Sequence, residues 1–396
     1  MAKPCGAAPQ ARLAAPHERH EDRVRVAYLS RGYTPHDHRF LTGLAEAGLD
    51  VFYLRLEPAG GTEARPLPAG IRPVEWAGGR SRFRLASVPR LAHDLRRTLA
   101  CLKPDLVHAG PIQLGAGLVA LSGFRPIVAM SWGSDLLRDA TSGTGRLAAR
   151  YALRRTASLV CDCQAVRAEA QRIGMAGERI IIFPWGVDLT HFRPGEDGGL
   201  RDRLGWTEKV VLLSTRSWEP IYGCLELVDG FIRAATEAPD LRLLMLGAGS
   251  LGPRIQAHLR AAQMLDRVHF TDQVPYSELL QHYRAADLYV SASHSDGSSV
   301  SLLEAMACGL PAIVSDIPGN REWVEPGKTG WCFPVGDADR LAETIREAVS
   351  AHGEWPMLGR QVRATTEERA DWRRNFPLLF DAYRMAIDAR GSDAHG

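Results

Sequence analysis

Two carboxylates beside a loop of small residues form the part of the sequence richest in chemistry. Asp296 stands in that loop, and Glu304 stands eight positions later in an apolar run typical of a helix. Each carboxylate can accept two hydrogen bonds from neighbouring hydroxyl groups. Small residues before a helix leave its first backbone N–H groups accessible, and the helix dipole attracts an anion there. The sequence therefore predicts a site for a ligand with phosphate and hydroxyl groups, formed by Asp296, Glu304, Gly297, Ser298, Ser299 and Val300.

The elements that must position these residues are predicted by the pattern around them. The run 287–291 is typical of a buried strand and the run 300–308 of a helix, so the loop follows the carboxyl end of a strand. Ligands bind at that edge of a parallel α/β sheet. The same alternation predicts strands at 23–30, 49–54, 105–108, 126–131, 158–163, 179–183, 209–215, 241–246, 267–270 and 312–314, and helices at 38–48, 87–103, 115–122, 225–236, 252–263, 276–285, 338–350 and 371–390.

The alternation falls into two halves, which predicts an α/β fold with two doubly wound parallel sheets. A turn-rich stretch at 184–194 and a glycine-rich stretch at 195–200 separate the halves. We expect a disordered tail at 1–21, a Rossmann-like domain at 22–194 and a second one at 195–370. A C-terminal helix and tail follow at 371–396. Each half is long enough to bury a core of its own.

The string from Ser291 to Pro334 resembles the nucleotide-sugar signature of the GT-B glycosyltransferases, specifically the retaining family 4. Two acids separated by seven residues are followed by Ala-Met-Ala-Cys-Gly-Leu-Pro at 305–311 and by Gly-Asn-Arg-Glu at 319–322. The stretch 184–194 resembles the linker of the family, and Gly247 begins a Gly-Ala-Gly turn like the one that follows a family strand. The likeness extends from Val24 over nearly the whole remaining chain.

This resemblance implies two Rossmann-like domains that face each other across a cleft, with the C-terminal helix returning to the N-terminal domain. The C-terminal domain would bind a UDP- or GDP-sugar, the N-terminal domain would bind the acceptor, and transfer would proceed with retention and without a metal or other cofactor. Glu304 would hold the ribose, while Asp296 and the backbone of 297–300 would face the sugar and diphosphate. Arg216, after the strand 209–215, would neutralise the leaving diphosphate. The remaining donor contacts would involve Gly247, Gln273 and Val274.

Three departures from the family pattern leave parts of the site open. The first acid is Asp296, where glutamate is usual. A Lys-Gly pair that normally follows the arginine is Tyr222-Gly223 here, so the second phosphate contact would come from Tyr222, His294 or His36. The histidine that many relatives carry in the N-terminal domain is absent from Ser-Trp-Gly-Ser-Asp at 131–135. His36 and His108, at the ends of predicted strands, are the candidates for a catalytic role in its place.

Composition narrows the classes of function and partner. A net charge of +2 excludes a strongly basic nucleic-acid binder, and no run of about 20 apolar residues predicts a transmembrane helix. Seven cysteines lack metal-binding spacing and no secretory signal is visible, which predicts reduced thiols, a cytoplasmic protein and no metal site. The arginine-rich segment 80–97 is either a solvated face or a surface for an anionic acceptor or, weakly, an acidic membrane. The sequence does not indicate the oligomeric state.

Two rival functions stay open beside the transferase. A sugar-nucleotide epimerase would share the fold and the donor, whereas a phosphorylase would need a lysine-bound pyridoxal cofactor, for which none of the four lysines stands in a suitable motif. A sugar-nucleotide-binding protein without catalysis is favoured slightly by the missing lysine and histidine. The acceptor is open as well: a cell-surface glycan intermediate or a small natural product, joined through oxygen, nitrogen or sulfur, fits equally.

Overall fold

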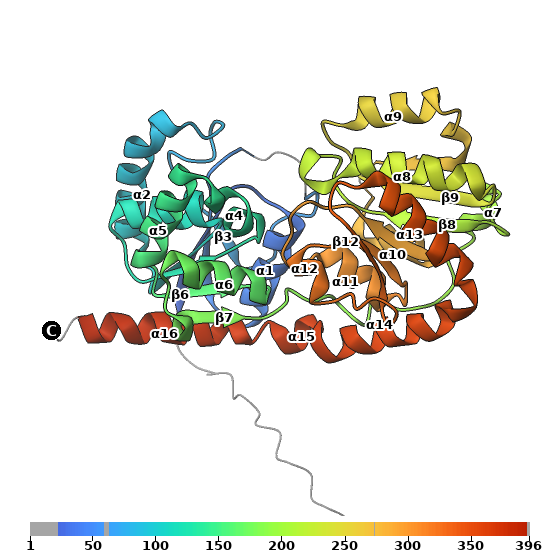
Figure 1. Ribbon diagram of the computed structural model, residues 1–396. Coiled ribbons are helices and arrows are strands. Elements are labelled where there is room, and N and C mark those ends of the chain that lie inside the picture. The colour runs from blue at the N-terminus through green and yellow to red at the C-terminus, as the bar shows by residue number, and fades with distance from the viewer. Residues whose placement is uncertain (1–22, 59–62, 273, 394–396) are drawn as a thin grey trace, which may run out of the picture. The chain divides into compact units, whose positions relative to one another are not determined.

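Short runs of aliphatic residues form two parallel sheets, of seven and six strands, with helices between successive strands (Figure 1). The computed structural model describes residues 23–58, 63–272 and 274–393, so the predicted tail at 1–21 and the candidate Gln273 lie outside the described residues. The chain divides into two compact units, Met1–His108 and Ala109–Gly396. The predicted fold class is confirmed, because both sheets are parallel and wrapped by helices.

The unit Met1–His108 holds one edge of the first sheet, in which β2 pairs in parallel with both β1 and β3. Thr34 caps the helix that follows β1: its hydroxyl accepts a hydrogen bond from the Asp37 backbone N–H, and the Asp37 carboxylate accepts one from the Thr34 backbone N–H, which forms a capping box. The elements are β1 (Arg25–Ser30), α1 (Pro35–Glu46), β2 (Asp50–Arg55), β3 (Ile71–Pro73), η1 (Leu85–Ser87), α2 (Val88–Leu102) and the start of β4 (Leu106–Ala109).

The unit Ala109–Gly396 begins with three parallel neighbours in the order β5-β6-β7. Several of its helices were not predicted from the sequence pattern. The elements are η2 (Ile112–Ala116), α3 (Gly117–Ser122), β5 (Ile127–Met130), α4 (Ser134–Leu137), η3 (Asp139–Thr141), α5 (Gly143–Arg155), β6 (Ser158–Cys161), α6 (Gln164–Ile173), η4 (Gly177–Arg179) and β7 (Ile180–Ile182).

The six-stranded sheet of the same unit has the order β10-β9-β8-β11-β12-β13. Alternate residues of β8 enter different cores: Val211 and Leu213 pack into one cluster, and Leu212 into the other, so both faces of the sheet are buried. The elements are α7 (Leu200–Leu204), β8 (Val210–Ser214), η5 (Pro220–Tyr222), α8 (Cys224–Glu237), β9 (Leu241–Leu246), α9 (Gly252–Ala261), η6 (Leu265–Arg267), β10 (Val268–Thr271), α10 (Tyr276–Arg284), β11 (Leu288–Ser291), α11 (Val300–Ala307), β12 (Ala312–Ser315), α12 (Pro318–Arg321), β13 (Gly330–Phe333) and α13 (Ala338–Ser350).

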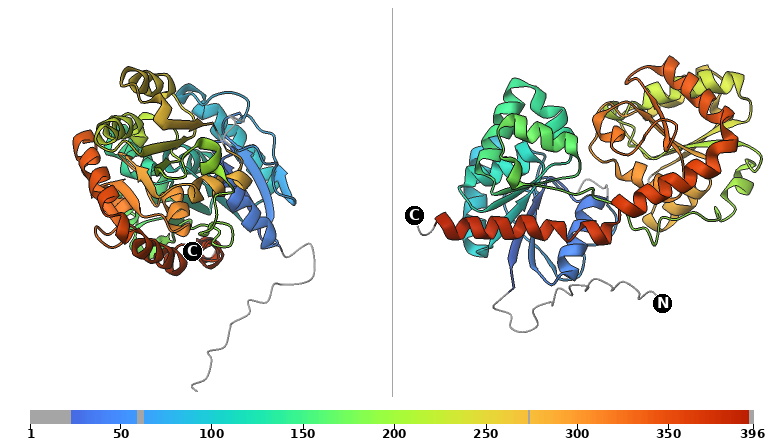
Figure 2. Two further views of the ribbon diagram at one scale, coloured as in Figure 1. Left: turned by 90° about the vertical axis from the view of Figure 1, so that its right-hand side faces the viewer. Right: turned by 60° about the horizontal axis from the view of Figure 1, so that its bottom comes forward.

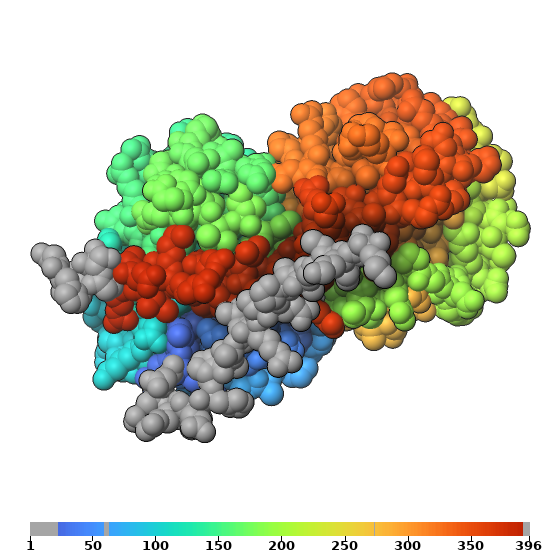
Figure 3. Space-filling view, turned by 90° about the horizontal axis from the view of Figure 1, so that it is seen from below, coloured from blue at the N-terminus to red at the C-terminus, as the bar shows by residue number. Residues whose placement is uncertain are grey.

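The last helices, which follow η7 (His352–Glu354), run back from the six-stranded sheet to β5–β7. These helices are α14 (Trp355–Arg369), α15 (Trp372–Asn375) and α16 (Leu378–Asp393). Figures 2 and 3 show this red segment lying along the green part of the chain. Two hydrogen bonds fix the return: Ser158 Oγ donates to the Ala382 carbonyl at 2.8 Å, and Asn375 Nδ2 donates to the Pro184 carbonyl at 3.1 Å. The predicted return of the C-terminal helix is therefore confirmed.

The expectation of one continuous helix at 371–390 is wrong. The segment forms two helices, α15 and α16, with Phe376 and Pro377 between them. Pro377 has no backbone N–H, so the hydrogen-bond ladder of α15 stops at Phe376, although the Phe376 backbone itself is still helical. Asp371 starts α15 by accepting a hydrogen bond from the Arg373 backbone N–H at 2.9 Å.

Candidate functional site

Arg216 is the centre of a buried polar cluster just past the carboxyl end of β8. One guanidinium nitrogen, Nη2, donates to Asp296 Oδ2 at 2.6 Å, and the other, Nη1, donates to the hydroxyls of Ser299 at 2.7 Å and Ser301 at 3.1 Å. Burial alone would lower the pKa of Arg216, but the Asp296 carboxylate outweighs that effect and raises it above its ordinary value. Arg216 therefore carries a fixed positive charge.

The Nε–H of this guanidinium is buried and has no hydrogen-bond partner among the described residues. A buried donor without a partner is costly unless a ligand or ordered water completes it. The Ser214 hydroxyl at the end of β8 and the Thr271 hydroxyl at the end of β10 are likewise buried and without a partner in the described part of the chain. The carboxyl edge of this sheet thus has unused capacity for an oxygen-rich ligand.

Tyr222 and His294 are the two candidates of this unit for the place of the missing lysine. The Tyr222 ring lies under the guanidinium of Arg216, with 4.1 Å between the ring centroid and Cζ, so it holds the arginine by a cation–π contact. His294 Nε2 lies 3.2 Å from Glu226 Oε1, and the His294 backbone N–H donates to the Ile221 carbonyl. Tyr222 supports Arg216, and His294 is oriented toward α8.

Glu304 lies within α11 and accepts a hydrogen bond from the Tyr283 hydroxyl at 2.7 Å. Thr215 Oγ1 lies 3.3 Å from the same hydroxyl, which connects Glu304 to the segment that carries Arg216. Burial, followed by the negative charge of Glu304, raises the pKa of Tyr283 well above its ordinary value, so the phenol stays protonated as a donor. Tyr283 was not predicted as a site residue.

The loop before α11 is more enclosed than the sequence indicated. We expected accessible backbone at Gly297, Ser298 and Ser299, but all three residues are buried. The Ser298 N–H donates to Asp162 Oδ2, and the Gly297 N–H donates to the adjacent Asp296 carboxylate. Asp162, a carboxylate at the end of a strand, was missed because its partner stands 136 positions away.

The other donor candidates flank this cluster. Val300 is half-buried and is the first residue of α11. Gly247 has φ = +117°, and a Cβ there would lie 3.0 Å from the Arg216 carbonyl, so the turn after β9 lies against the arginine's backbone. Val274 is half-buried and packs against the core cluster that includes Tyr283. The structure thus brings Val274, Gly247 and the loop 296–300 to the same edge of the six-stranded sheet.

His36 and His108 belong to the other unit. His36 is half-buried in the first turn of α1. His108 is fully buried in β4, with its ring edge-on to Tyr28 at 4.9 Å between centroids, and burial lowers its pKa to about 3. The imidazole is therefore neutral at ordinary pH and enclosed by the core of Met1–His108, contrary to the expectation of a strand-end histidine available to a substrate.

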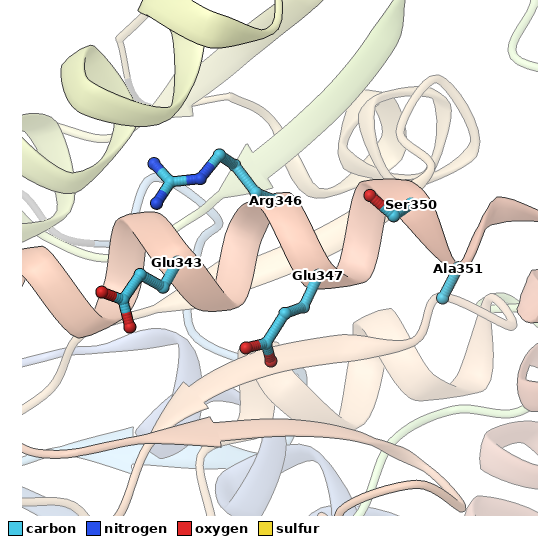
Figure 4. A pocket seen from close by; sticks show the side chains of 5 residues that line it. All are labelled: Glu343, Arg346, Glu347, Ser350 and Ala351. Carbon is cyan, nitrogen blue, oxygen red and sulfur yellow. The ribbon is translucent and has the colours of Figure 1, made fainter.

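Two surface hollows lie outside this cluster. One, of about 630 Å³, runs along α13 and is lined by Glu343, Arg346, Glu347, Ser350 and Ala351 (Figure 4). Figure 4 shows both glutamates directed away from the arginine, so these charges do not converge on a common point. The other lies between β13 and α14 and includes Trp323 and Arg369. Neither hollow contains a predicted site residue.

Within the described ranges, no group of three or more His, Cys, Asp or Glu side chains is placed to hold a metal ion. Among the same residues, no helix combines the length and the hydropathy that a membrane crossing requires.

Two family models match the chain in succession. Residues 32–191 match "Glycosyltransferase Family 4", and residues 203–367 match "Glycosyl transferases group 1". Together they cover most of the chain, and the cluster around Arg216, Asp296 and Glu304 falls within the second match.

The curated relatives agree with these matches. A D-inositol 3-phosphate glycosyltransferase of Geodermatophilus obscurus is 32% identical over 225 residues, which are 54% of this chain and 49% of the relative. A GDP-mannose-dependent monoacylated alpha-(1-6)-phosphatidylinositol monomannoside mannosyltransferase of Corynebacterium glutamicum is 27% identical over 203 residues, 48% of this chain and 52% of the relative. The chain therefore spans about half the length of the curated relatives it matches.

A solved structure supports the fold. HepE of Anabaena, in complex with UDP and glucose, superposes with a TM-score of 0.77 at 19% identity and covers 91% of this chain and 99% of HepE. At this identity the likeness establishes the architecture alone, which agrees with the two parallel sheets and the returning C-terminal helix.

Proposed function

Because the chain belongs to the GT-B glycosyltransferases of family 4 and group 1, we propose that it transfers a sugar from a UDP- or GDP-sugar to an acceptor, with retention of configuration and without a metal. The observation that carries the donor assignment is the buried guanidinium of Arg216. Its Nε–H has no partner among the described residues, and it lies between a carboxylate and the first turn of a helix. A fixed positive charge in a water-poor site is suited to stabilise the charge that develops on a leaving diphosphate.

Each polar group of the cluster has a place in this reaction. Arg216 would bind the diphosphate through its free N–H, assisted by the start of α11. Glu304, held by the Tyr283 hydroxyl, would accept hydrogen bonds from the ribose diol. Asp296 would face the transferred sugar from its position beside Arg216. Catalysis would then consist of positioning and charge stabilisation, and no residue is assigned as a covalent nucleophile.

The relatives supply support for both donor bases. The Corynebacterium relative is named for GDP-mannose, and the HepE structure contains UDP and glucose. We keep both bases in the proposal, because the base contacts would involve the segment around Gln273, which lies outside the described residues. The acceptor stays in the broad class of glycan intermediates or small natural products bearing oxygen, nitrogen or sulfur nucleophiles.

The first test is a calorimetric titration with UDP, GDP and ADP, with and without EDTA, on the wild type and on Glu304→Gln. The variant keeps an acceptor oxygen for Tyr283 but loses the charge. We expect one nucleotide to bind the wild type in the presence of EDTA, and E304Q to bind it roughly 10–100-fold more weakly, since a hydrogen bond to a charged group contributes about 1.5–3 kcal/mol. Glu347→Gln, exposed on α13, is the matched control.

Unchanged affinity in E304Q would remove Glu304 from the donor site. Nucleotide binding without sugar transfer to any member of a broad acceptor panel would favour the non-catalytic binding protein. Conversion of the free sugar nucleotide to its epimer would favour the epimerase.

We also propose an acidic membrane as the surface on which the acceptor is met. Leu85, the first residue of η1, is 81% exposed, and the arginines around it in sequence are exposed and form no ion pair within the described residues. An exposed apolar side chain among basic ones is typical of a peripheral membrane contact, and it favours this over a solvated face. These arginines are Arg80, Arg82, Arg84, Arg90, Arg96 and Arg97.

A further inference from the structure

A buried carboxylate holds the loop on which the donor diphosphate would bind. Asp162 follows β6 and is 3% exposed. The Ser298 backbone N–H donates to its Oδ2 at 2.8 Å, and the Ser298 hydroxyl donates to its backbone carbonyl at 2.8 Å. These two bonds fix Ser298, which stands two positions before the start of α11. Asp162 therefore sets the position of the loop before this helix.

The approach between this carboxylate and the loop is close enough to require glycine. A Cβ at Gly297 would lie 2.4 Å from Asp162 Oδ2. On its other sides the same glycine is approached by Gly133 and Gly319, where an added Cβ would lie 2.6 Å from the Gly297 nitrogen and 2.3 Å from its carbonyl oxygen. A movement of the loop away from Asp162 is therefore opposed by backbone on the other sides.

The charge on Asp162 is poorly compensated. No N–H or O–H group among the described residues donates to its second oxygen, Oδ1. The pKa of Asp162 is raised to about 7, because burial and the negative charge of Asp296 outweigh the hydrogen bonds from the Ser298 N–H, its own backbone N–H and the Cys163 thiol. The carboxyl is therefore divided between its acid and ionised forms near neutral pH.

Within the described residues, no ion pair joins Asp162 to a cation. On its own segment stand the thiols of Cys161 and Cys163, whose pKa values are raised above their ordinary range by burial. The loop contributes Asp296, whose carboxylate is bound by Arg216. The negative charge of Glu322 raises the pKa of the Cys161 thiol, and the positive charge of Arg167 lowers it. The Glu322 carboxylate also accepts hydrogen bonds from the first two backbone N–H groups of α6.

We propose that Asp162 is a positioning residue of the donor site that takes up a proton when the donor diphosphate binds the loop it holds. The proposal rests on the proposed function, since it requires a diphosphate near Ser298 and Ser299. An added negative charge disfavours a nearby ionised carboxylate. The neutral acid keeps an oxygen that accepts from the Ser298 N–H, so the loop stays in place while the repulsion disappears.

The sign of the pH dependence follows from this coupling. Diphosphate raises the pKa of Asp162, so binding draws in a proton wherever the free carboxyl is ionised, that is, above about pH 7. Affinity must then fall as pH rises through that window. The diphosphate itself does not contribute there, because a terminal phosphate is fully ionised above its pKa of about 6.

The test is calorimetry with UDP and with GDP at pH 7.5 and 8.5, each in two buffers of different ionisation enthalpy. We expect the nucleotide that binds the wild type to bring in up to about one proton, and its Kd to rise by up to about tenfold between the two pH values. Asp162→Asn accepts the same hydrogen bond from Ser298 without a charge, so its Kd should be nearly pH-independent and its proton uptake absent. Glu178→Gln, exposed beyond α6, should behave as the wild type.

The outcomes separate this inference from the proposed function. Binding to the wild type with no proton uptake and a constant Kd overturns the role of Asp162 and leaves the donor site standing, and this result needs no variant. In a second outcome, the Kd of Asp162→Asn differs from that of the wild type by the same factor at both pH values, and the variant still takes up a proton on binding. This result would show that Asp162 supports only the fold. Failure of both nucleotides to bind the wild type overturns the donor site and this inference together.

Discussion

At the scale of single residues, the site depends on how many partners one guanidinium can hold at once. Arg216 engages a carboxylate, two serine hydroxyls and a tyrosine ring. Its planar fork allows this, whereas a lysine ammonium is a point charge on a flexible stem. The substitution Arg216→Lys therefore preserves the charge and removes the geometry.

We expect Arg216→Lys to lower the rate of sugar transfer or donor hydrolysis by roughly 10²–10³-fold, the usual loss when one group that stabilises transition-state charge is removed. The measurement is nucleotide release from the UDP- or GDP-sugar that the wild type binds. Arg254→Lys, exposed on α9, provides the control. A variant as fast as the wild type would show that Arg216 has only a structural role.

The residues that sequence reasoning found and missed differ in one physical respect. Arg216 and Asp296 stand in loops that follow strands, and Glu304 stands in the helix after one of these loops, where local pattern indicates a site. Tyr283 and Asp162 act through contacts that only the folded chain creates, since Asp162 meets its partner across 136 positions. The enclosure of the 297–299 loop was missed for the same reason.

At the scale of elements, the turn between η5 and α8 lies against the carboxyl end of β11, where the loop that leads to α11 begins. Gly223 has φ = +59°, and a Cβ there would lie 2.1 Å from the Ala292 carbonyl oxygen. A side chain at this position meets both backbone strain and a collision with backbone that cannot rotate away.

We expect Gly223→Ala to reduce the free energy of unfolding by more than about 2 kcal/mol, combining left-handed backbone strain with the collision. Gly205→Ala is the matched control: it has φ = +66° with nothing within 4 Å, so about 1 kcal/mol of strain is its whole cost. Urea unfolding followed by circular dichroism measures both. Equal losses in the two variants would show that the approach to Ala292 relaxes at no cost.

The sequence pattern predicted the strands that are apolar throughout and the helices that have one apolar face. Strands such as β8, β9 and β11 were predicted on that basis. The helix α5 was missed because its sequence, rich in glycine, alanine and arginine, has no clear apolar face. The break at Pro377 was missed because the periodic pattern on both sides of the proline outweighed its known effect on helices.

At the scale of the whole molecule, the exposed arginines of 80–97 concentrate positive charge on one segment, although the net charge of the chain is only +2. We expect the protein to sediment with vesicles containing acidic phospholipid at low salt and to be released as salt rises, because screening weakens such contacts. Binding of the double variant Arg82→Gln/Arg84→Gln should fall several-fold.

The control for this measurement is Arg254→Gln/Arg260→Gln, which removes the same charge from exposed positions of α9. Equal losses in the two double variants would assign the attraction to net charge alone. An absence of sedimentation by the wild type at low salt would eliminate the membrane surface, and the segment would then be a solvated face or a contact for an anionic acceptor.

The return of α15 and α16 to β5–β7 bears on how the protein is made. Ser158 finds its hydrogen-bond partner at Ala382, more than two hundred positions later. A ribosome adds roughly 5–20 residues per second, so β6 waits on the order of 10–40 s for the helix that covers it. Until then the apolar face of this sheet is open to water and to other chains. All strands of the six-stranded sheet are synthesised after β5–β7 but before α16. The six-stranded sheet can therefore be complete before β5–β7 are covered.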